Sequence, residues 1–273
     1  MLHDQLARPL DLAGTNVILT GGGSGLGRAM AIALAGAGAN VALSGRRTAP
    51  LEATARQIQA AGGRALVVTA DITDSASVKA MVDQAISDFG KVDVLVNNAG
   101  MVRGQGGVAL WDITDDQWRA GIEANLTGAF FCARAVARHM SERGRGKIIN
   151  VSSGYGLRGA RDNYMYACAK GGIVQLTRSL AVSLGRYGIT SNAIVPGLFP
   201  TEGTADSAME LPSGEFIPVG RVGDPDELGP VAVWLAGPGS DYMTGEIFVV
   251  DGGGLAGGIA PTGHAPVAEL ARG

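Results

Sequence analysis

Runs of β-branched and other apolar residues alternate along the chain with longer amphipathic stretches, and this alternation restricts the fold more than any other feature. The runs span 16–20, 40–44, 65–70, 92–98, 147–153, 190–196 and 246–252. Most are continuously apolar, as expected of strands covered on both faces. The stretches between them have helical spacing of apolar residues, and most end in glycine. The pattern predicts an α/β fold in which one doubly wound, mostly parallel, seven-stranded sheet has helices on both faces.

Length and composition are consistent with a single domain. The chain has 273 residues, of which 46% are hydrophobic, and these suffice for one large core. We expect the core at about 12–254, with 1–11 and 255–273 as terminal extensions. The Gly-, Pro- and Ala-rich tail is either disordered or laid over a neighbouring subunit. Two predicted helices, 115–143 and 166–187, are apolar on more than one side, which indicates burial against another subunit.

Charge and composition disfavour several classes of partner. The net charge is −3 without long charged runs, which argues against nucleic acid or an anionic membrane surface. No apolar run reads as a membrane span, and the N-terminus lacks the apolar centre of a signal peptide. Cys132 and Cys168 have no CxxC partner, so we expect buried thiols in a reducing cytoplasm. The histidines, at positions 3, 139 and 264, share no ligand-like spacing, and no metal site is predicted.

A glycine cluster follows the first predicted strand and opens the first predicted helix. Backbone N–H groups at a helix N-terminus attract anions, and glycines let a pyrophosphate approach closely. The alternative is an ordinary tight turn, but the position in the first strand–helix unit favours a dinucleotide cofactor. The predicted cofactor-binding residues are Thr20, Gly21, Gly23, Ser24, Gly25, Leu26 and Gly27.

The tip of the second strand indicates which dinucleotide binds. An acidic residue there would bind the ribose 2′-hydroxyl, but the sequence reads Ser44-Gly45-Arg46-Arg47. Arg46 is placed to pair with a 2′-phosphate. NADP(H) is therefore favoured, with NAD(H) as the alternative. A solvated basic turn is the other interpretation of these arginines.

The stretch "RDNYMYACAKGG" (161–172) contains two tyrosines and one lysine. Residues four apart share a helix face, so Tyr166 and Lys170 are predicted neighbours, whereas Tyr164 points elsewhere. A helix start with a surface lysine and buried aromatic residues is the alternative. Lysine is scarce in this chain, which makes an incidental lysine at this spacing less expected than an arginine.

Taken together with "NNAG" (97–100) and "NVSS" (150–153), these motifs resemble the short-chain dehydrogenase/reductase family in order and spacing, over about 12–254. The resemblance implies a single Rossmann domain and hydride transfer between a nicotinamide cofactor and a secondary alcohol or ketone. The catalytic residues that it implies are Asn125, Ser153, Tyr166 and Lys170. The further cofactor-binding residues that it implies are Asp71, Ile72, Asn98, Ala99, Gly100, Pro196, Gly197, Phe199 and Thr201, together with Tyr166 and Lys170.

The implied mechanism depends on a tyrosine that exchanges protons with the substrate oxygen. Tyr166 would donate the proton during reduction, and a nearby Lys170 ammonium would lower the tyrosine pKa from about 10. Ser153 would position the substrate oxygen. Asn125 would kink its helix and hold a water that links Lys170 to solvent. Tyr155 either faces the substrate with Ser153 and Tyr166 or is a packed loop aromatic residue.

Several alternatives stay open at this point. A non-catalytic dinucleotide sensor could dispense with the proton relay, which this chain keeps. An enoyl reductase of related fold would place tyrosine and lysine about seven apart, and a halohydrin-cleaving relative would lack the glycine loop. The substrate could be a 3-oxoacyl thioester, a sugar or polyol, or a cyclic or aromatic secondary alcohol. Arg103, Arg158 and Arg161 either meet an anionic group or are solvated. The resemblance also suggests a homotetramer built through the long helices and the last strand.

Overall fold

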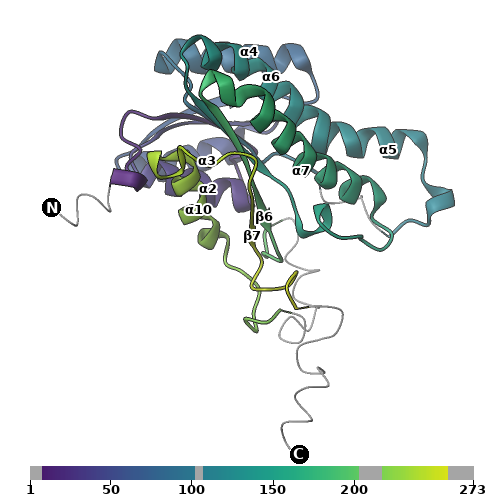
Figure 1. The fold of residues 1–273 in the computed structure, drawn as a ribbon. Helices are drawn as coiled ribbons and strands as arrows, with labels where there is room; N and C mark the ends of the chain where they lie inside the picture. The colour runs from purple at the N-terminus through teal and green to yellow at the C-terminus, as the bar shows by residue number, and fades with distance from the viewer. Residues whose placement is uncertain (1–7, 102–106, 203–216, 258–273) are drawn as a thin grey trace, which may run out of the picture.

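All seven predicted strands are present in the computed structural model, which describes residues 8–101, 107–202 and 217–257, and they form one parallel sheet (Figure 1). The strand order is β3-β2-β1-β4-β5-β6-β7, which confirms the doubly wound prediction. The strands are β1 (Asn16–Thr20), β2 (Asn40–Gly45), β3 (Arg64–Thr69), β4 (Val94–Asn97), β5 (Gly146–Val151), β6 (Ile189–Pro196) and β7 (Ile247–Val250).

Helices cover both faces of the sheet and explain why the inner strands are continuously apolar. In β1, Val17 and Leu19 pack into one buried cluster, whereas Ile18 packs into the other. The first cluster includes residues of α2 (Gly25–Gly36), α3 (Thr48–Ala60) and α10 (Gly229–Ala236). The second includes residues of α4 (Ser75–Phe89) and α6 (Gly128–Glu142), and α7 (Tyr164–Leu184) lies beside α6 in Figure 1.

The long helix predicted over 115–143 is interrupted. It consists of α5 (Asp115–Ile122), a π-helical turn (Glu123–Thr127) and α6. A π turn adds one residue to the helical repeat, so it changes which side chains face the sheet. The second long helix, α7, begins at Tyr164, two residues before its predicted start, and a 3₁₀ turn (Gly185–Tyr187) follows it.

The sheet order places one crevice between the ends of β1 and β4. The chain leaves β1 toward β2 on one side and reaches β4 on the other, so the loops after these strands diverge. Ligands of open α/β sheets bind at such a point, beyond the carboxyl ends of the strands. The predicted functional segments follow the C-terminal ends of the first six strands, and the fold therefore gathers them at one edge of the sheet.

Some expectations concern residues that the structure does not describe. Arg103, most of the predicted specificity loop after β6 and most of the C-terminal tail lie outside the described ranges. Within those ranges, no helix is both long and apolar enough to cross a membrane.

The expectation that both cysteines are buried is wrong for one of them. Both thiols are free; Cys132 is buried between α6 and the sheet, but Cys168 is exposed on α7. Cys168 lies on the opposite side of the helical repeat from the buried Ile173 and Thr177, five and nine positions later on α7, so its side chain points outward.

Candidate active site

Hydrogen bonds from the segment after β4 support the glycine loop. The Asn98 amide Nδ2 donates to the carbonyl oxygens of Thr20 (3.0 Å) and Gly21 (3.3 Å). The Thr20 hydroxyl accepts the N–H groups of Asn98 and Ala99, both at 3.1 Å. Thr20 is thus buried and supports the loop, and it does not line the cleft above it.

Two glycines of this loop meet requirements that other residues could not. Gly21 has φ +72°, which L side chains rarely adopt, and its Cα is packed against Asn98 and Ala99. At Gly27 a Cβ would overlap the carbonyl oxygen of Gly21, so only glycine lets α2 start this close to the loop. The result is a helix N-terminus with open backbone N–H groups, which suits a pyrophosphate.

The far end of the cleft carries two guanidinium groups. Arg46 and Arg47 follow the end of β2, line the cleft and are exposed. Asp71, after β3, accepts the Thr73 N–H (2.9 Å) and the Thr73 hydroxyl (2.8 Å) on Oδ1. These bonds, with a contribution from the Arg46 charge, hold the Asp71 carboxyl pKa below its usual value. Ile72 lies beside them on the cleft wall.

The tyrosine, serine and lysine predicted for catalysis meet at the other end. Tyr166 and Lys170 lie one turn apart on α7, and Ser153 lies two residues after the end of β5. The Lys170 ammonium is buried, donates to the carbonyl oxygen of Val151 (2.9 Å) and lies 5.6 Å from the centre of the Tyr166 ring. Ser153 lies close enough to the Tyr166 phenol to lower its pKa, and its hydroxyl accepts the Tyr155 N–H at 3.2 Å.

The pKa of Tyr166 is shifted opposite to the direction expected from the sequence. Burial is the largest cause and raises it, Tyr155 raises it further, and the neighbouring Ser153 lowers it. Burial also lowers the pKa of Lys170 to about 8. The same loss of solvent favours the neutral form of each group: it raises the pKa of the Tyr166 phenol and lowers the pKa of the Lys170 ammonium. The expectation that the Lys170 charge, together with the oxidised nicotinamide, lowers the pKa of the phenol concerns the chain with its cofactor bound and stays a prediction.

Asn125 occupies the π-helical turn between α5 and α6. Its Oδ1 accepts the Met101 N–H (2.9 Å), and its Nδ2 donates to the carbonyl oxygens of Met101 and Gly121, each at 3.0 Å. A Cβ added to Gly100 would lie 2.6 Å from the Asn125 Oδ1 and 3.6 Å from the Lys170 Nζ. Asn125 therefore fixes the chain after β4 directly beside the lysine.

The segment after β6 closes the cleft from the opposite wall. Gly197 donates its N–H to Val250 and packs on Asp251 so closely that a Cβ would be 2.6 Å from the Asp251 Cα. Further along, Thr201 lies against Gly25 of the glycine loop, and Arg28 pairs with Glu202 at 2.6 Å. Pro196, Gly197, Phe199 and Thr201 all line the cleft.

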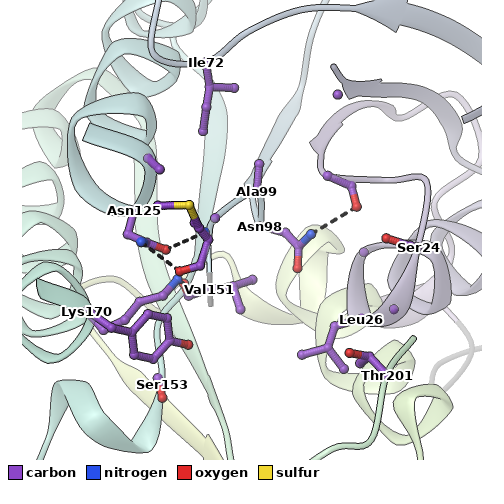
Figure 2. Close-up of a pocket in the computed structure, with 18 of the residues that line it drawn as sticks. Ser24, Leu26, Ile72, Asn98, Ala99, Asn125, Val151, Ser153, Lys170 and Thr201 are labelled. Carbon is purple, nitrogen blue, oxygen red and sulfur yellow. Dashed lines mark hydrogen bonds between the residues drawn. The ribbon is translucent and has the colours of Figure 1, made fainter. Parts of the chain in front are cut away.

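These parts form one continuous cleft of about 1010 Å³. Figure 2 shows Lys170, Asn125 and Ser153 on one side, Ser24, Leu26 and Thr201 on the other, and Asn98 and Ala99 between them. Of the predicted catalytic, cofactor and substrate residues, only Thr20 does not line it. The volume is at the upper end of the roughly 300–1,000 Å³ typical of ligand sites. Glycines, an open helix N-terminus and the arginines fit a phosphate-bearing dinucleotide.

Tyr155 forms part of the mouth of the cleft. The Tyr155 ring packs edge-on against the Tyr166 ring, with 6.5 Å between the two centroids. The Arg158 guanidinium lies 5.6 Å from the centre of the Tyr155 ring. Arg161 is almost fully exposed and pairs with Asp162 at 3.5 Å. Of the two described arginines considered for anion binding, neither lines the cleft. Tyr164 does not line it either; its hydroxyl meets the Asp162 carboxylate at 3.5 Å.

The cleft also contains residues that sequence reasoning did not identify. Asn163, three residues before Tyr166, lines it, as do Met101, Ala120, Glu123 and Ala124. Ala120 on α5 and Glu123 and Ala124 in the π turn are close neighbours of Asn125 in the sequence, and this proximity is the signal that could have identified them. Asn163 had none, since an asparagine before a helix is ordinarily a cap. Among the described residues no group of three potential ligands could hold a metal ion.

Comparisons with known proteins show which family the chain resembles. The family model described as enoyl-(acyl carrier protein) reductase matches residues 21–254. A short-chain type dehydrogenase/reductase from Mycobacterium marinum is 35% identical, with a TM-score of 0.85 covering 90% of this chain and 98% of its own. A gluconate 5-dehydrogenase from Burkholderia cenocepacia J2315, solved with NADP and tartrate, is 34% identical, with a TM-score of 0.86 covering 92% and 99%.

A curated relative shows the same relationship at the level of sequence. Cis-4-hydroxycyclohexanecarboxylate dehydrogenase of Sinomonas cyclohexanicum is 39% identical over 201 residues, which are 73% of this chain and 80% of the relative. The motifs, the sheet order and these matches agree with one another. The chain belongs to the short-chain dehydrogenase/reductase family and is a nicotinamide-dependent oxidoreductase of alcohols and ketones.

Proposed function

We propose that the protein interconverts a ketone and a secondary alcohol with NADP(H), using Tyr166 as the proton donor and acceptor. The observation that carries this proposal is that one cleft joins the glycine loop and Arg46 to the group of Tyr166, Ser153 and Lys170. The bound nicotinamide supplies or accepts the hydride. The remaining work is proton transfer and positioning, and the chain's own side chains perform it.

The four polar residues have separate roles in this proposal. Tyr166 gives its proton to the substrate oxygen during reduction and recovers it during oxidation. Ser153, which lies beside the phenol, orients that oxygen. Lys170 holds the nicotinamide ribose and favours the phenolate by its charge. Asn125 fixes the Met101 backbone beside Lys170 and anchors a water that connects the lysine to solvent.

Substituting Tyr166 tests the proton transfer. Tyr166→Phe removes one oxygen from a buried ring, and we expect turnover to fall by about 10²–10⁴-fold. The affinity for the nucleotide should remain close to that of the wild type, because the glycine loop and Arg46 are unchanged. Rates are followed by absorbance at 340 nm and binding by calorimetry. Tyr164→Phe is the matched control, two residues away and outside the cleft. Retained activity in Tyr166→Phe would exclude this acid.

The preference for NADP(H) rests on Arg46 and Arg47, which line the cleft where no acidic residue ends β2. NAD(H) is the alternative. Arg46→Ala should raise the KM for NADPH roughly tenfold and the KM for NADH much less, since only NADPH has the 2′-phosphate. Arg56→Ala is the control, because that exposed guanidinium on α3 pairs with Glu52 outside the cleft. A wild-type enzyme that prefers NADH would contradict the assignment.

The substrate classes consistent with the site are secondary alcohols and ketones, including sugars or polyols and cyclic or aromatic compounds, with 3-oxoacyl thioesters as an alternative. The four-residue spacing of Tyr166 and Lys170 supports carbonyl rather than enoyl reduction, although the matching family model carries the enoyl reductase description. A screen of alcohols and carbonyl compounds at 340 nm separates these classes.

The proposal also covers the oligomeric state of the protein and its cellular compartment. We propose one catalytic domain with its core at about 12–254, assembled as a homotetramer through the helix pair α5–α6, α7 and the edge strand β7. The supporting observation is that large apolar side chains are exposed on each of these elements, among them Trp118, Phe130, Val182 and Val249. Two free thiols suit a reducing compartment such as the cytoplasm.

A further inference from the structure

An ion pair joins the segment after β6 to the start of α2, beside the glycine loop. The Arg28 guanidinium on α2 lies 2.6 Å from the Glu202 carboxylate, although the two residues are 174 positions apart in the sequence. Their side chains are 38% and 59% exposed, and neither residue lines the cleft. The pair is therefore placed to act on a bound dinucleotide through its neighbours rather than by contact.

The segment that carries Glu202 is anchored at its other end to the C-terminal part of the fold. The Gly197 N–H donates to the Val250 carbonyl oxygen, and the Leu198 carbonyl oxygen accepts the Gly223 N–H, both at 2.9 Å. The ring of the buried Phe199 packs on Gly223, where a Cβ would lie 2.3 Å from a ring carbon. The first three residues after β6 are therefore fixed by bonds and packing that do not involve the ion pair.

Two residues further on, the same segment reaches the glycine loop. A Cβ added to Gly25 would lie 3.1 Å from the Thr201 Cγ2, so the two residues are in contact. Figure 2 shows Thr201 beside Leu26 on one side of the cleft, and all three residues line it. Residues 198–202, which we call the strap, thus run from β6 to the glycine loop. The ion pair of Glu202 fastens the strap immediately after this contact.

We propose that Arg28 is a positioning residue: its bond to Glu202 holds Thr201 against the glycine loop and thereby slows the release of a bound dinucleotide. This inference rests on the proposed cofactor site. The contact that the ion pair secures lies at the helix start that suits the pyrophosphate, which NADPH and NADH share. The ion pair should therefore act on both nucleotides alike, unlike Arg46, and should leave proton transfer at Tyr166 unchanged.

A double-mutant cycle tests the inference. The variants are Arg28→Gln, Glu202→Gln and the double variant, and the release of NADPH and of NADH is measured by stopped-flow displacement with nucleotide fluorescence. Each single substitution should raise both dissociation rates about two- to fivefold, which is the range expected for loss of an exposed ion pair. The double variant should match the single variants, because the second substitution removes a bond that the first has already broken. The single-turnover rate of hydride transfer should stay that of the wild type.

Lys79→Gln is the control, because Lys79 forms an exposed ion pair with Asp83 on α4, outside the cleft. It should leave both dissociation rates unchanged, and Arg28→Lys, which keeps the charge, should stay close to the wild type. Unchanged rates in the single variants, effects that add in the double variant, or a change confined to NADPH would overturn the inference. The proposed function fails separately, if the wild type binds nucleotide as expected but Tyr166→Phe stays active.

Discussion

Lys170 is a charged residue placed where charge is unfavourable. Its ammonium is buried, has a single described acceptor in the Val151 carbonyl oxygen, and has its pKa lowered to about 8 by burial. Groups with strongly perturbed pKa values cluster at functional sites, because chemistry near neutrality needs them. Near neutral pH the lysine is still mostly protonated, so the protein retains this charge at a cost in stability.

The pH dependence of stability should reveal that cost. The pKa of lysine is about 10.4 in an unfolded chain, so between the two pKa values the unfolded state binds more protons than the folded state. The free energy of unfolding should therefore rise with pH. Relative to Lys170→Met, the wild type should gain about 2 kcal/mol between pH 7 and 9.5. Urea unfolding at several pH values measures the difference, and a difference that does not change with pH would contradict it.

At the scale of single residues, local motifs could be predicted from the sequence, whereas properties set by the folded surroundings of a side chain could not. Gly21 and Gly27 follow from local sequence, because a tight strand–helix turn needs glycine wherever the backbone approaches itself. The rise in the Tyr166 pKa depends on how much solvent the folded site excludes. The ion pair of Arg28 with Glu202 joins residues 174 positions apart, which no spacing rule specifies.

At the scale of elements, predictability follows the strength of periodicity. All seven strands were found because parallel strands buried on both faces are continuously apolar. Helix α10, "GPVAVWLA", was not predicted, since it is short and apolar nearly all round and so has no amphipathic pattern. The π turn around Asn125 also leaves no sign in the spacing of apolar residues along the sequence. It was expected only as a kink implied by resemblance, and its bonds to Met101 show what holds it.

The same elements explain why the site is rigid where chemistry occurs. Ser153 follows a central strand, and Tyr166 and Lys170 lie on the longest described helix, which packs against β6. Asn98, after β4, ties the glycine loop to the catalytic side through its bonds to Thr20 and Gly21. The residues proposed to hold the cofactor and those proposed to move the proton are therefore positioned by one sheet.

At the scale of the whole molecule, the proposed tetramer would account for large apolar side chains that are exposed in the single chain. Val182 on α7 is 86% exposed in the single chain, and Trp118 and Phe130 on α5 and α6 are also exposed. Val249 is exposed on β7, which lies at the edge of the sheet. In the proposed tetramer these side chains would be covered by neighbouring copies of the chain. Closed symmetric assemblies bury such surfaces against copies of themselves.

A mass measurement with one charged substitution tests the proposed tetramer. The wild type should scatter light as a particle of four times the 27.7 kDa chain. Val182→Lys should lower that mass, because a lysine in an apolar contact would be desolvated without a partner. In the isolated chain the same lysine would remain in water, so the thermal unfolding of a dissociated form should be little affected by it. Ile32→Lys is the control, an exposed apolar position on α2, away from the proposed interfaces. A wild-type mass near that of one chain would exclude the tetramer, and an unchanged mass in Val182→Lys would remove α7 from its interface.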